Sequence, residues 1–120
     1  MPWLPVSSRC ARTGSGLTFT VADKWGTLAL VALTESPYRF NALRRRVDGV
    51  SEKMLAQTLH ALERDGLVTR EVQATIPARV EYTLTAPGAR IAATLRALLE
   101  ALEAEIPAIM TAREDYDRRH

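Results

Sequence analysis

Four side chains that donate hydrogen bonds recur at helical spacing in the middle of the chain: Lys53, Gln57, His60 and Arg64. On an α-helix these positions fall within about 60° of one another and form one face. The nearby acids, Glu52 and Glu63, are rotated toward the flanks of that face. Lys and Arg can pair with guanine edges or phosphates, and Gln can pair with adenine. The face therefore suits duplex nucleic acid, and the alternative is an ordinary solvated helix surface.

The helix that carries this face has clear start and stop signals. Ser51 is a strong N-cap residue, and Val50 before it can pack against Leu55 as a hydrophobic staple. Leu55, Leu59 and Leu62 point away from the polar face, which predicts that they are buried. Ala56 lies beside the polar face and allows close approach. Gly66 suits a left-handed C-terminal cap, so we expect a helix from Ser51 to about Arg64.

A short basic helix is predicted just before it. Tyr38–Phe40 is expected as a very short strand, and Asn41 as the N-cap of a helix that runs through Arg46. Asp48-Gly49 is a turn signal between the two helices. Arg44 and Arg45 on the first helix are candidates for contact with a nucleic-acid backbone, although runs of charge are usually solvated.

Two strands are predicted after the second helix, over Leu67–Val72 and Val80–Leu84. The connection from Gln73 to Arg79 exceeds a tight hairpin turn, so it should project as a loop. Arg79 at its base could enter a narrow minor groove or hold a phosphate. A surface ion pair with Glu71 or Glu81 is the alternative for Arg79.

Apolar helices flank this central unit. One is expected to start near Val21 and to end at Glu35-Ser36-Pro37, because proline cannot extend a helix. The other begins at Thr85, is bent or broken by Pro107, and is followed by a charged tail expected to fray from Asp115 to His120. Its apolar stripe follows spacings of three and four residues and consists of Ile91, Leu95, Leu98, Leu99, Leu102 and Ile106. So much apolar surface predicts a homodimer through the N- and C-terminal helices.

Composition sets the class of protein. The 120 residues are enough for one domain, expected as an arm over residues 1–16, a domain over 17–106 and a tail over 107–120. The span 39–79 holds eight Lys and Arg against five Asp and Glu, whereas 80–120 holds five against seven. A basic middle suits a polyanion. The sequence contains neither a membrane span nor a signal peptide, which predicts a cytoplasmic protein.

The stretch from Asp23 to Gly88 resembles the HxlR family of winged helix-turn-helix regulators, which are relatives of the MarR group. The matching segments follow one another with natural spacing: Lys24-Trp25, Tyr38-Arg39-Phe40-Asn41-Ala42-Leu43-Arg44-Arg45, Gly49-Val50-Ser51-Glu52-Lys53-Met54-Leu55, Leu59-His60-Ala61-Leu62-Glu63-Arg64-Asp65-Gly66-Leu67-Val68, Pro77-Ala78-Arg79-Val80-Glu81-Tyr82-Thr83-Leu84-Thr85 and Gly88. The resemblance implies a mainly helical α+β fold, a winged helix-turn-helix with a two- to three-stranded wing sheet and flanking dimerisation helices. It implies a dimeric transcriptional repressor or activator whose helix from Ser51 to Arg64 reads the major groove.

The residues and the resemblance together give one set of candidate DNA-binding residues: Ser51, Lys53, Ala56, Gln57, His60, Arg64, Arg44, Arg45 and Arg79. Members of the family often carry an N-terminal cysteine that senses oxidants or electrophiles, which makes Cys10 a candidate redox sensor. Arg9 and Arg12 could lower its pKa. This chain departs from the family pattern in having Ala11 after the cysteine, and an inert thiol is the alternative.

The residues fit other classes of function less well. One cysteine and two distant histidines do not supply a zinc site, and no cofactor is expected. No nucleophile with a base and no paired carboxylates indicate an enzyme. A winged helix used only for protein–protein contact is the main rival. A small effector could also bind beside Trp25 and Tyr82, although aromatic residues in such places are more often core.

Overall fold

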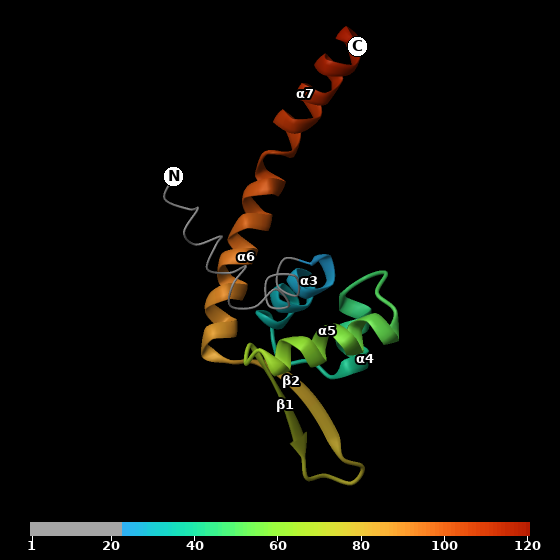
Figure 1. Ribbon diagram of the computed structural model, residues 1–120, viewed down its shortest axis with the longest axis vertical. Coiled ribbons are helices and arrows are strands. Elements are labelled where there is room, and N and C mark those ends of the chain that lie inside the picture. The colour runs from blue at the N-terminus through green and yellow to red at the C-terminus, as the bar shows by residue number, and fades with distance from the viewer. Residues whose placement is uncertain (1–22) are drawn as a thin grey trace.

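A computed structural model describes residues 23–120 of the chain. Within that range the order is α3 (Lys24–Leu33), α4 (Phe40–Arg46), α5 (Glu52–Arg64), β1 (Val68–Gln73), β2 (Arg79–Leu84), α6 (Ala86–Ala104) and α7 (Ile106–Arg119). Figure 1 shows α3, α4 and α5 gathered in one body, with the β1–β2 hairpin projecting from it. Helices α6 and α7 extend away in the opposite direction. The expected mainly helical fold with a wing is therefore confirmed, whereas the arm over residues 1–16 and Cys10 lie outside the described residues.

The core lies where α3, α5 and the start of α6 meet the base of the wing. Its fully buried large side chains are Leu30, Leu43, Leu55, Leu59, Leu62 and Val68. Burying a leucine or valine stabilises a fold by about 1.5–3 kcal/mol. Because α5 supplies three of these six, its orientation in the body is strongly determined.

The caps predicted for α5 are confirmed. The Ser51 hydroxyl accepts a hydrogen bond from the Met54 amide at 3.1 Å, which closes the first turn. At the other end Gly66 has a φ of 75°. The Leu67 amide donates to the Leu62 carbonyl at 3.0 Å, which is the bond pattern of a Schellman cap. The chain thereby reverses direction directly into β1.

The wing is a two-stranded antiparallel sheet in which Val68 pairs with Leu84 and Gln73 with Arg79. Each strand extends one residue beyond the predicted end next to the loop, so the loop spans only residues 74–78. The prediction of a third, very short strand over Tyr38–Phe40 is wrong. Tyr38 forms a single isolated bridge with Tyr82, and Phe40 already belongs to α4.

Two predicted helix starts are also wrong. Helix α3 starts at Lys24 rather than near Val21, because Asp23 is extended and its carbonyl accepts the Thr27 amide at 2.9 Å. The N-cap of α4 is Arg39 rather than Asn41. Both backbone hydrogen bonds of the Tyr38–Tyr82 bridge, at 3.1 and 2.8 Å, hold the chain extended up to Arg39, so the helix begins immediately afterwards.

Helices α6 and α7 follow one another with a break between them. The Thr85 hydroxyl caps α6 by accepting the Gly88 amide at 3.1 Å, as predicted. Glu105 separates α6 from α7, and Pro107 sits in the first turn of α7, where its missing N–H costs nothing. The prediction that the tail frays from Asp115 is wrong, because α7 continues to Arg119. Arg118 pairs with Asp115, and the Tyr116 and His120 rings stack at 4.2 Å.

Candidate nucleic-acid interface

Helix α5 presents two different surfaces. Leu55, Leu59 and Leu62 are buried in the core, as predicted from their spacing. The opposite surface consists of exposed side chains, namely Lys53, Ala56, Gln57, His60 and Arg64. The four polar side chains among them make no hydrogen bond or ion pair with any described residue. They are therefore available to a partner, and Ala56 leaves room for it.

A turn holds α4 and α5 together. Gly49 adopts a φ of 89°, a conformation that residues with a side chain rarely take, and it lies against the Trp25 ring. Trp25 and Tyr82, the two candidate effector contacts, pack against the core. Both side chains are half-buried, which favours a packing role for them.

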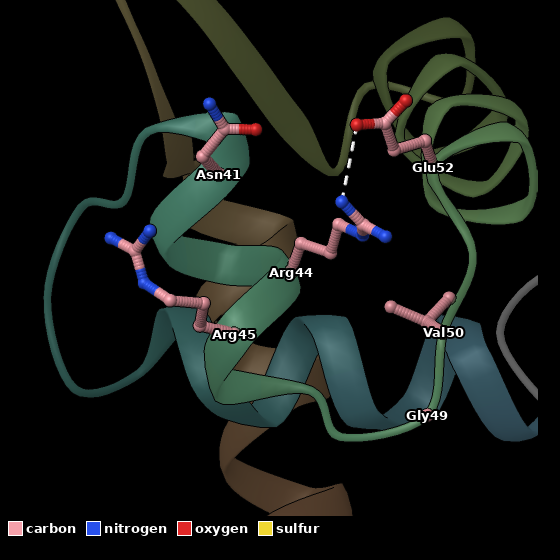
Figure 2. A pocket seen from close by; sticks show the side chains of 6 residues that line it. All are labelled: Asn41, Arg44, Arg45, Gly49, Val50 and Glu52. Atoms are coloured by element: carbon pink, nitrogen blue, oxygen red, sulfur yellow. Dashed lines mark hydrogen bonds and ion pairs between the residues drawn. The ribbon is translucent and has the colours of Figure 1, made fainter.

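A polar pocket of about 450 Å³ opens between α4 and the start of α5. Figure 2 shows Arg44 reaching across it to Glu52, with 3.1 Å between Arg44 Nη1 and Glu52 Oε1. Arg45 points away from this pair on the other side of α4. Exposed ion pairs contribute little to stability, so Arg44 can exchange Glu52 for a phosphate at small cost.

Arg46 is engaged differently from its two neighbours. It donates two hydrogen bonds to the Glu35 carboxylate, at 2.9 and 2.6 Å. Tyr38 donates a third to the same carboxylate at 2.8 Å. Hydrogen bonds from Arg46, then from Tyr38, lower the pKa of Glu35 to about 2. Arg46 therefore ties the end of α4 to the segment after α3, and it is not part of the candidate interface.

The predicted position of Arg79 at the base of the wing loop is confirmed. Arg79 opens β2, is exposed and pairs in register with Gln73. It forms no ion pair with Glu71, Glu81 or any other described residue. The structure thus contradicts the ion-pair interpretation of Arg79 and leaves its guanidinium free at the wing.

The roles of two residues were missed from the sequence. Helical spacing places Glu52 only on the flank of the polar face, but Glu52 also pairs with Arg44 across the turn. Ile76 in the wing loop was not considered, and it is the most exposed large hydrophobic residue that the structure describes. No local spacing rule connects residues eight apart across a turn, whereas the exposure of Ile76 could have been inferred from its place in a predicted loop.

Two kinds of site are not found in the described part of the chain. Residues 23–120 contain no group of three or more His, Cys, Asp or Glu side chains placed to hold a metal ion. No helix in the same range is long and apolar enough to cross a membrane.

Two helices joined by a turn, the second with a free polar and basic face, followed by a two-stranded wing, define a winged helix-turn-helix DNA-binding protein. The model of the HxlR-like helix-turn-helix family matches residues 20–110. The chain belongs to this family and is a DNA-binding transcriptional regulator.

Individual relatives agree with this assignment. The chain is 44% identical over 95 residues to the uncharacterized HTH-type transcriptional regulator YtfH of Escherichia coli, covering 79% of this chain and 75% of YtfH. The solved structure of a transcriptional regulator ytfH from Salmonella typhimurium matches with a TM-score of 0.75 and 43% identity, over 82% of this chain and 88% of that one. The redox regulator HypR in its reduced form matches with a TM-score of 0.72 and 27% identity, over 89% and 98%.

Proposed function

We propose that the protein is a homodimeric repressor or activator that reads duplex DNA by placing α5 in the major groove. The observation that carries this proposal is the exposed, unpaired face of Lys53, Gln57, His60 and Arg64 on a helix anchored by three buried leucines. Ser51 caps this helix. On α4, Arg44 points toward α5 and Arg45 lies on the other side of α4, and both are exposed and can contact phosphates. Phosphate contacts position a protein on DNA, whereas base contacts specify the sequence.

The dimer is proposed to form along α6 and α7. Leu98, Leu102 and Ile106 are 55%, 49% and 50% exposed, and Ile109 and Met110 continue the same stripe. Helix α7 buries none of its residues within the described chain. Packing against a second copy would cover this surface. Two-fold symmetry then places two copies of α5 about 34 Å apart, one turn of the duplex.

Lys53→Ala, Gln57→Ala and His60→Ala are each expected to weaken sequence-specific DNA binding by roughly 1–3 kcal/mol, the value of a lost base contact. The measurement is a gel shift at fixed salt on the upstream promoter DNA, with random duplex as competitor. Glu63→Ala is the matched control, because Glu63 is exposed on the flank of the same helix. Unchanged affinity in all three variants would remove α5 as the reading helix and favour a winged helix that binds protein.

We also propose that Cys10 senses oxidants or electrophiles, on the strength of its resemblance to a family cysteine and of the likeness to the redox regulator HypR. Diamide is expected to abolish the promoter gel shift of the wild type and to leave Cys10→Ser unaffected. If both proteins respond to diamide alike, or neither responds, Cys10 is an inert thiol.

A further inference from the structure

The tip of the wing carries an apolar side chain with no intramolecular partner. Ile76 is 103% exposed, and Val72 at the end of β1 is 58% exposed. Most of the other exposed large hydrophobic residues follow α6 and α7, where the proposed dimer covers them. The wing points away from α6 and α7, so a dimer along these helices does not cover Ile76 (Figure 1).

Thr75 orders the loop through two hydrogen bonds. The Thr75 amide donates to the Gln73 carbonyl at 2.8 Å, and the Thr75 hydroxyl donates to the Pro77 carbonyl at 2.7 Å. The Gln73–Arg79 pair closes the loop at its base. These contacts order the backbone on both sides of Ile76 and leave its side chain presented to the outside.

The charges of the wing indicate what covers this tip. From residue 72 to residue 80 the only charged side chain is Arg79, and no acid is present. The first acids, Glu71 and Glu81, face each other in register behind the tip. A polyanion is therefore attracted by Arg79 and repelled by the Glu71–Glu81 pair, which limits contact to the loop and the two strand pairs nearest to it, Gln73–Arg79 and Val72–Val80.

We infer that the wing tip is a wedge for the DNA minor groove, in which Ile76 inserts at a base step while Arg79 contacts the adjacent groove wall or phosphate. Apolar side chains used in this way partly unstack the step and kink the duplex. The inference rests on the proposed placement of α5 in the major groove, because the neighbouring minor groove is then the surface that the wing meets. Such a wedge makes the binding affinity depend directly on the deformability of the bound DNA sequence.

The test uses duplexes that the full-length protein selects from a random pool, with 2-aminopurine placed in turn at each step of the flanking minor groove. Wild-type binding is expected to raise the fluorescence at one step in each half-site, because the base there unstacks. Ile76→Ala is expected to remove this rise and to weaken binding roughly tenfold, because the variant lacks part of the apolar surface that Ile76 buries in the groove. The dependence of its affinity on salt should stay that of the wild type, because no charge is lost.

Two matched variants separate this wedge from the rest of the interface. Val72→Ala, also exposed on the wing but behind the tip, should keep the fluorescence rise. Arg79→Ala should weaken binding with a shallower salt dependence.

Two results would overturn the wedge: no fluorescence rise with the wild type, or an Ile76→Ala variant that binds like the wild type. If Gln57→Ala still weakens binding in that case, the proposed function stands without the wedge. Failure to select any duplex overturns both the wedge and the proposed function, and leaves a protein partner as the alternative occupant of the wing tip.

Discussion

Replacing both Leu98 and Leu102 with Asp is expected to convert the protein to monomers without unfolding the winged helix. Both side chains are about half exposed in the single chain, so they contribute little to its own core. In a dimer along α6 they would be covered, and each buried carboxylate would then cost several kcal/mol. Sedimentation velocity measures the loss of the dimer, and far-ultraviolet circular dichroism checks that the helices remain.

The same change should nearly abolish binding to a two-site operator. A dimer binds two half-sites with one docking event, whereas a monomer loses the contacts of the second α5. We expect the affinity to fall by about 100-fold or more. Ala93→Asp is the control, because Ala93 is exposed on the side of α6 turned about 180° from Leu102. A double variant that still sediments as a dimer would place the interface outside this stripe.

Gly88→Ala is expected to be the most destabilising conservative change in the described chain. A Cβ at Gly88 would lie 1.9 Å from the Leu67 carbonyl oxygen and 2.8 Å from the Leu67 carbonyl carbon. Both are backbone atoms, so the backbone of the chain would have to move. That oxygen also accepts the Thr85 amide at 3.1 Å, and the Thr85 hydroxyl donates to the Gly66 carbonyl at 2.6 Å. The clash therefore disrupts the junction that joins α5, the wing and α6.

We expect the free energy of unfolding to fall by about 3 kcal/mol, at the upper end of the usual cost of overpacking. Urea denaturation of the dimeric protein at fixed concentration measures it as a lower midpoint with an unchanged slope. Gly66→Ala is the control: its φ of 75° is strained with a side chain, but nothing lies within 4 Å of the added Cβ. It should cost about 1–2 kcal/mol. Equal losses in the two variants would contradict the close approach at Gly88.

The polar face of α5 could be predicted from the sequence because it depends on one helix alone. Positions three and four residues apart share a face whatever surrounds the helix, so Leu55 and Leu59 identified the buried side and Gln57 the free one. The caps at Ser51 and Gly66 were predictable for the same reason. Their hydrogen bonds join residues three to five apart, and few side-chain types make them.

Features that join distant parts of the chain were decided only by the tertiary structure. The Tyr38–Tyr82 bridge moved the start of α4 to Phe40, although Asn41 has the better capping side chain. The contact of Gly88 with Leu67 and the pairing of Arg44 with Glu52 depend on how α6 and α4 cross their neighbours. The sequence alone determined which helix faces are apolar and which are polar. The packing determined which charged groups are paired and which remain free for DNA, because neutralisation depends on distance in space and not on separation along the chain.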